Sequence, residues 1–328
     1  MIASPVTSRR LACRKLALLK QVGLFGADTK GAIIRRAYTA RDLQQAYRLV
    51  HDVFLDTGYM KPEPSGIRLR MYETLSETAT FIAEKNGTVV GVLSVVGDSP
   101  ELGLPSDAAF KPELDAMRRS SARLCELTNQ AVAEDYRKSA VATELMRCAI
   151  AHGMTAGYDE SVATVSPGHN GFYEMVGFRG LGSQRSYSKK LHDPVVALTM
   201  DLDRYRRPVD GLGETGSFLN HFGRDDNPFL AHVAGWTQQA RSHFRTAELL
   251  QELFVKERNF LAECSPDELE ILEQRWGEET FFAVATASAS LLDPELPAEP
   301  NSPLEYSTGQ TYSACEVESD FVLEAAFA

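Results

Sequence analysis

Residues 124–151 contain the pattern that most restricts how this chain can fold. A run from Leu124 to Val132 is typical of a strand, a short polar turn follows it, and an amphipathic helix is predicted from Ser139 to Ala151. A helix that begins so soon after a strand presents its unpaired backbone N–H groups and the positive end of its dipole at that turn. The pattern therefore predicts a phosphate-binding turn in an α/β domain.

The turn reads Arg137-Lys138-Ser139-Ala140-Val141-Ala142. Arg137 or Lys138 can supply positive charge, and Ser139 can cap the helix. Glycine normally lets such a turn wrap a pyrophosphate with positive φ, and Ala140 and Ala142 make that wrap harder. The turn therefore suits a single phosphate better than a pyrophosphate. A degenerate turn that binds no donor is the alternative.

Charge and composition divide the chain into four parts. The chain has 328 residues, 44% of them hydrophobic, with a formal net charge of −11 and a pI near 5.2. This charge argues against a nucleic-acid partner. We expect a basic arm (1–30), a folded domain (31–207), a helical extension (208–292) and an acidic flexible tail (293–328). The arm is either a peripheral contact with the inner membrane or a tail, in a protein that we expect to be cytoplasmic.

The domain should be a mixed, mostly antiparallel α/β sheet flanked by helices. Thr39 is predicted to cap a helix, and Asn86-Gly87 is a strong signal for a hairpin between two β-rich runs. Ser265-Pro266 marks a helix start in the extension. Further elements are predicted at residues 32–37, 113–119, 161–165, 178–185 and 195–202. Neither the scattered cysteines nor His221, His232 and His243 resemble a metal site.

Glu126 is the candidate base. It lies early on the predicted strand, where glutamate is disfavoured. An amine attacks a carbonyl only when it is neutral, so a carboxylate that removes a proton is useful there. An ordinary exposed strand glutamate is the alternative.

A second motif, Phe172-Tyr-x-x-x-Gly-Phe178, lies after the predicted strand at 161–165. Gly177 should end a short helix, and Phe178 should enter the core. Tyr173 could donate a proton to a leaving group, or it could serve packing alone.

Taken in order, these segments resemble the long-chain N-acyl amino acid synthases of the FeeM type, within the Gcn5-related N-acyltransferase superfamily. The similar segments, within residues 33–205, include Val53–Tyr59, Phe81-Ile-Ala, Asp98–Asp107, Glu113–Arg118, Glu126-Leu-Thr, the donor turn, His169–Phe178 and Asp193–Leu198. The resemblance implies transfer of a long-chain fatty acyl group from the phosphopantetheine thioester of an acyl carrier protein to the α-amine of a free amino acid. It implies no metal and no permanently bound cofactor. Ala140 departs from the family pattern and puts the use of coenzyme A in doubt.

The resemblance also distributes candidate roles. Glu126 and Tyr173 would be catalytic, and the donor phosphopantetheine would lie on Val132, Arg137, Lys138, Ser139, Ala140 and Ala142. Thr128, Arg118 and Arg119 would bind the acceptor, although Arg68 and Arg70 are equally eligible cations for its carboxylate. The acyl chain would lie against Phe81, Leu93, Val95 and Phe172, each of which could also be plain core.

Three other functions stay open. An acyl-homoserine lactone synthase and a coenzyme A-dependent N-acetyltransferase share the fold. A non-catalytic module that binds a carrier protein through this fold is the alternative of another class.

Overall fold

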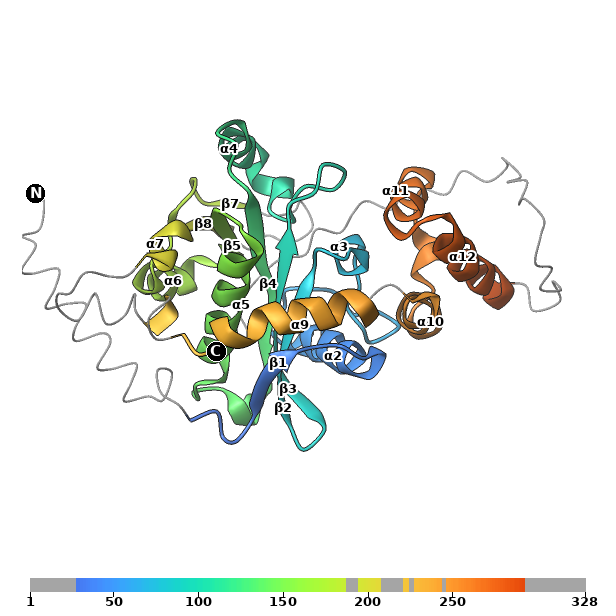
Figure 1. Ribbon diagram of the computed structural model, residues 1–328, viewed down its shortest axis with the longest axis horizontal. Coiled ribbons are helices and arrows are strands. Elements are labelled where there is room, and N and C mark those ends of the chain that lie inside the picture. The colour runs from blue at the N-terminus through green and yellow to red at the C-terminus, as the bar shows by residue number, and fades with distance from the viewer. Residues whose placement is uncertain (1–27, 187–193, 208–220, 224–226, 244–245, 293–328) are drawn as a thin grey trace, which may run out of the picture.

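The computed structural model describes residues 28–186, 194–207, 221–223, 227–243 and 246–292. Most of the basic arm (1–27) and the acidic tail (293–328) lie outside these ranges. Within them, no helix is long and apolar enough to cross a membrane. Figure 1 shows a central sheet with helices on both sides.

Eight strands form the sheet in the order β1-β2-β3-β4-β5-β8-β6, and β7 pairs with β8. Every pair is antiparallel except β4 with β5. This arrangement confirms the mixed, mostly antiparallel sheet that the sequence predicts. The strands are β1 (Ile33–Arg36), β2 (Ala79–Lys85), β3 (Thr88–Gly97), β4 (Leu124–Val132), β5 (Glu160–Val165), β6 (Arg179–Gly180), β7 (Arg185–Ser186) and β8 (Pro194–Asp201).

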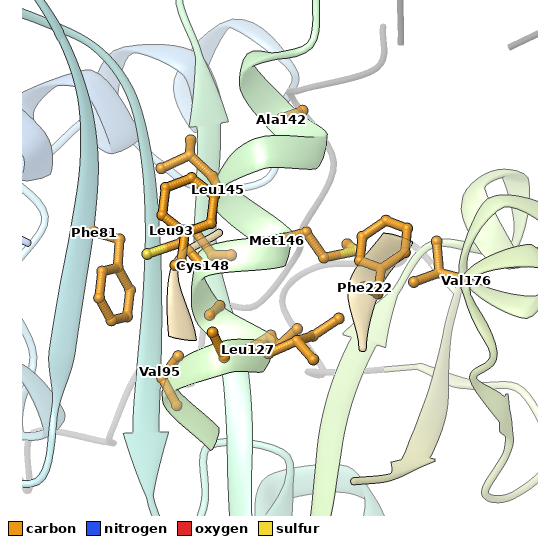
Figure 2. Close-up of a cluster of buried hydrophobic side chains, with 14 of the residues drawn as sticks. Phe81, Leu93, Val95, Leu127, Ala142, Leu145, Met146, Cys148, Val176 and Phe222 are labelled. Carbon is orange, nitrogen blue, oxygen red and sulfur yellow. The ribbon is translucent and has the colours of Figure 1, made fainter. Parts of the chain in front are cut away.

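Helices cover both faces of the sheet. On one face α5 (Val141–Ala156) packs with α6 (Asn170–Val176) and α9 (Leu230–His243). Figure 2 shows side chains from strands and helices meeting around α5 in this core. The other face carries α2 (Ala40–Asp56), α3 (Met71–Thr74) and α4 (Asp107–Arg119). Short α7 (Asp203–Arg206) follows β8, and 3-10 turns lie at Glu134–Tyr136, Pro167–His169 and Phe260–Glu263.

Local sequence signals explain several boundaries. Thr39 caps α2 in a reciprocal capping box with Asp42, as its side chain and spacing predict. Asn86 and Gly87 both have positive φ, 52° and 79°, and join β2 to β3 as the expected hairpin. Gly177 ends α6 with φ 112°.

Three predicted boundaries were wrong. The helix expected at Glu113 begins earlier, at Asp107. It includes Pro112, and its backbone is non-helical at Phe110, two residues before the proline. The single strand expected over 178–185 is two short strands, β6 and β7, because the ladder with β8 is interrupted between Gly180 and Arg185. The helix expected from Ser139 begins at Val141 with Ala140 as its N-cap residue.

The described part of residues 208–292 is largely helical. It contains α9, α10 (Ala247–Gln251), a π-helical turn (Glu252–Glu257), α11 (Pro266–Trp276) and α12 (Glu278–Leu292). Ser265 caps α11 in a capping box with Glu268, as predicted. The segment from α10 to α12 shares one apolar core with α2, including Phe254, Trp276 and Val50.

Gly91 on β3 lets α5 approach the sheet closely. A Cβ placed there would lie 2.7 Å from Val141 and 3.1 Å from Leu145. We predict that Gly91→Ala lowers the free energy of unfolding by about 1–3 kcal/mol, because this core has no room for the methyl group. Gly235→Ala is the control, since a Cβ there meets nothing within 4 Å and α9 favours alanine. Chemical denaturation of both variants measures the free energy of unfolding. A Gly91→Ala variant as stable as wild type would show that α5 can shift away from β3 to make room for the methyl group.

Candidate active site

The ladder between β4 and β5 ends early. Residues Leu124 to Leu127 pair with Glu160 to Ala163, and β4 then continues to Val132 without a partner on that side among the described residues. A bulge lies at this point, because Ser94 pairs with Thr128 and Val92 with Ala131. Asn129 has φ 55°, which fits the irregular backbone. We call residues 128–132 of β4, beyond the end of the ladder, the fork. Backbone groups at the fork can face a ligand instead of a strand.

Glu126 lies one residue before the last rung of this ladder and is completely buried. Its Oε2 accepts a 2.8 Å hydrogen bond from the backbone N–H of Ser106, just before α4. Its Oε1 is buried and has no hydrogen-bond partner within the described ranges. A buried carboxyl oxygen left without a partner is costly for stability, so it suggests a role beyond packing.

Burial raises the pKa of Glu126 to about 8, against the opposing effects of the Ser106 N–H and the positive charge of Arg70. A carboxyl with that pKa is mostly protonated at neutral pH, and about a tenth of it is ionised at pH 7. The ionised fraction can accept a proton, and a pKa close to the working pH is the property a general base needs.

A buried polar cluster lies beside Glu126, on the face of α2 and α3. Asn129 is its centre: its Oδ1 accepts from Arg68 at 2.6 Å and from Arg70 at 3.3 Å, and its Nδ2 donates to Glu73 at 2.9 Å. Burial opposes the ionisation of Glu73, but Arg70, Arg68 and Asn129 together lower its pKa. The cluster thus holds two guanidinium groups, Arg68 and Arg70, and one carboxylate, Glu73. The excess of positive charge favours an anionic ligand.

The other acceptor candidates fall elsewhere. The guanidinium of Arg118 donates hydrogen bonds from Nε, Nη1 and Nη2 to the carboxylates of Asp98, Asp107 and Asp115, at 2.6–2.9 Å. These carboxylates raise its pKa further, so its charge is already matched. Arg119 is exposed at the end of α4, and Thr128 is buried opposite Ser94. The positive charge of Arg70 therefore acts on Glu126, whereas Arg118 holds α4 in place through its three aspartates.

On the opposite face, Tyr173 of α6 reaches the fork. Its hydroxyl donates a 3.0 Å hydrogen bond to Oε1 of Gln130, and both side chains are fully buried. The Nε2 of Gln130 is buried without a hydrogen-bond partner in the described part of the chain. Burial raises the pKa of Tyr173 far above its usual value. Sequence reasoning missed Gln130, although a glutamine inside an apolar strand was a visible signal.

The predicted donor turn is present, with a different geometry. Arg137 folds back so that its Nε donates to the carbonyl of Val132 at 3.3 Å. Ser139 donates to Tyr136 and accepts a long bond from the N–H of Val141, so it does not serve as the N-cap residue. Lys138 is exposed and carries the positive φ, 58°.

The conformation of Ala140 corrects the expectation that alanine at this position hinders the turn from binding a pyrophosphate. Its φ is −73°, so this turn forms without glycine at that position. Its N–H donates to the carbonyl of Asp28 at 3.0 Å, where the chain leads into β1. Alanine at residue 140 therefore does not itself argue against a pyrophosphate donor. Ala142, in the first turn of α5, is buried.

The four acyl-chain candidates do not gather in one place. Phe81, Leu93 and Val95 are core residues beside α5, and Figure 2 shows them together there. Phe81 packs against the His152 ring at 5.5 Å. Phe172 lies on α6 against Tyr173, with ring centroids 5.5 Å apart, so it is the candidate near the fork.

A cleft of about 820 Å³ opens near the start of β4, lined by residues that include Asp98, Arg118, Leu124 and Tyr158. Its lining includes neither Glu126 nor Gln130. Among the described residues, no group of three or more His, Cys, Asp or Glu side chains could hold a metal ion.

Residues 45–201 match the family model of the N-acyl amino acid synthase FeeM. This segment is similar to the FeeM family, and the protein is an N-acyltransferase. The FeeM-type segment contains β2 to β8, Glu126, the polar cluster and the donor turn.

Solved structures with a similar fold were also found. FeeM from uncultured soil microbes is 21% identical and covers 52% of this chain and 91% of its own, with a TM-score of 0.47. The coenzyme A-dependent acyl-homoserine lactone synthase BjaI is 19% identical and covers 63% of this chain and 100% of its own, with a TM-score of 0.42. No curated protein matches the chain.

The raised pKa of Glu126 predicts a stability effect. The folded protein binds this proton more tightly than the unfolded chain does, so the free energy of unfolding should fall as pH rises from about 4.5 to about 8. Glutamine does not titrate. We predict that Glu126→Gln gains stability relative to wild type, by roughly a few kcal/mol, between pH 5 and pH 8.5.

Urea denaturation at the two pH values measures this change, with Glu273→Gln as the control at an exposed helix position. A Glu126→Gln difference that does not vary with pH would show that the carboxyl ionises in the folded protein as easily as in water.

Proposed function

We propose that this N-acyltransferase moves a long-chain fatty acyl group from the phosphopantetheine thioester of an acyl carrier protein to the α-amine of an amino acid. The observation that carries this proposal is the buried carboxyl of Glu126, with one unpartnered oxygen, beside the fork of a FeeM-family domain. A donor lying along the fork would bring its thioester close to this carboxyl.

The amine nitrogen attacks the thioester carbon, and Glu126 accepts a proton from the nitrogen, directly or through a water. The tetrahedral oxyanion is stabilised by N–H groups at the fork, where β4 has no partner on the side of β5 among the described residues. The C–S bond then breaks. The products are the N-acyl amino acid and a phosphopantetheine thiolate, which takes up one proton.

We assign Tyr173 a positioning role. Because burial raises its pKa so far, its phenol is a better hydrogen-bond donor than a proton source for a thiolate. Its bond to Oε1 holds the Gln130 amide with Nε2 available to the thioester oxygen. The thiolate is then protonated from solvent.

The acceptor's carboxylate is proposed to lie against Arg70. Arg70 belongs to the polar cluster, and its charge already acts on Glu126. An amino acid with its carboxylate there could direct its α-amine toward Glu126. Arg118, saturated by three aspartates, is a poorer choice.

The carrier-protein donor rests on the family and not on Ala140, since that residue has ordinary helical angles. Exposed Lys138 at the turn suits any phosphate group. The assay must therefore offer both donors.

We predict that purified protein, given C12–C18 acyl carrier proteins and pooled amino acids, forms N-acyl amino acids detectable by mass spectrometry; the chain lengths are chosen to sample long acyl groups. Glu126→Gln should lower kcat about 10²–10⁴-fold, since it removes the base and leaves the fork intact. Glu174→Gln, at an exposed position on α6, is the matched control.

Each other outcome identifies a different function. Product only from acyl-coenzyme A would exclude the carrier protein as the required donor. Lactone products would favour a homoserine lactone synthase, and carrier binding without turnover would favour a non-catalytic module. Full activity in Glu126→Gln would exclude this residue as the base.

A further inference from the structure

Helices beyond the FeeM-family match contact the segment that carries the polar cluster. Residues 63–77, here called the acceptor segment, lie between α2 and β2 and carry Arg68, Arg70 and Glu73 of the polar cluster. The segment has little regular structure, with only one helical turn, α3. Its own hydrogen bonds therefore cannot fix its position as a longer helix or a strand would.

Two side chains of the extension bind backbone carbonyls of this segment. Arg258 donates from Nη1 to the carbonyl of Leu69 at 3.3 Å, and Leu69 stands between Arg68 and Arg70. Trp276 donates from Nε1 to the carbonyl of Thr74 at 3.1 Å, next to Glu73. Both bonds thus end directly beside the charged residues of the polar cluster.

Ion pairs and apolar contacts support the same attachment. Arg258 also pairs with Glu63 at 3.2 Å, at the start of the acceptor segment. Arg275 pairs with Glu77, at its end. Ile67, Leu69 and Met71 lie in one apolar cluster with residues of the extension, including Leu253, Phe254 and Trp276. The segment is held at both ends and in the middle.

We propose that Arg258 and Trp276 are positioning residues, which set the place of Arg68, Arg70 and Glu73 and thereby the affinity for the acceptor's carboxylate. The inference rests on the proposed function, in which Arg70 binds that carboxylate. Neither side chain touches the fork or the donor turn in the described contacts. Their loss should therefore weaken acceptor binding and leave donor binding unchanged.

The test compares Arg258→Gln and Trp276→Phe with wild type. Each variant removes a charged or indole N–H donor and keeps a side chain that can pack. We expect the acceptor KM to rise about tenfold, as for the loss of one hydrogen bond to a carbonyl, with kcat and the donor KM within about twofold of wild type. Arg258→Lys should restore part of the affinity.

Arg48→Gln is the matched control. It breaks the ion pair between Arg48 of α2 and Glu257, which also joins the extension to the domain but does not contact the acceptor segment. Its acceptor KM should equal that of wild type. A fall in kcat, or a rise in the donor KM with the acceptor KM unchanged, would overturn the proposal.

Hydrogen exchange of residues 63–77 gives a readout that does not depend on activity. We expect faster exchange in Arg258→Gln and Trp276→Phe but not in Arg48→Gln. Unchanged exchange would overturn the proposal. If wild type transfers no acyl group to any amino acid, the proposed function fails and the claim about acceptor affinity fails with it. Faster exchange in the two variants would then show that the attachment itself is real.

Discussion

The early end of the β4–β5 ladder is the constraint on which the site depends. Past Leu127 and Ala163, β4 stays paired with β3 but has no partner on its other side among the described residues, and the bulge at Asn129 adds a residue opposite β3. This irregular stretch separates two environments: Asn129 joins the polar cluster near Glu126, and Gln130 meets Tyr173 on the face of α6. A regular ladder would pair these backbone groups with a neighbouring strand and leave none for a substrate.

The pKa of Glu126 depends on the burial of its side chain beneath the start of α4. The N–H before α4 reaches its carboxyl, and Arg118 ties α4 to Asp98 in the loop after β3. Arg118 therefore acts on the site indirectly, by holding in place the helix that covers the proposed base, Glu126. A more exposed Glu126 would have a lower pKa and would be a weaker base at neutral pH. The exposed ion pairs elsewhere have no such consequence.

Local signals in the sequence were sufficient for the elements and for one catalytic candidate. Thr39, Asn86-Gly87 and Ser265 determine a cap or a turn through their own side chains or backbone, so they could be read directly. Glu126 stood out because strands disfavour glutamate. The different surroundings of Arg70 and Arg118 could not be predicted, since they depend on partners up to 59 residues away. The core role of Phe81, Leu93 and Val95 likewise depends on where α5 packs.

The most direct test of this account is a titration of the Glu126 carboxyl itself. Carbon-13 NMR of the side chain, assigned by comparison with Glu126→Gln, would follow its ionisation in the free protein. The account predicts a midpoint near pH 8, because burial outweighs the Ser106 N–H and Arg70. A midpoint near 4.5, the ordinary value for glutamate, would show that the carboxyl is hydrated and would contradict its role as a buried base.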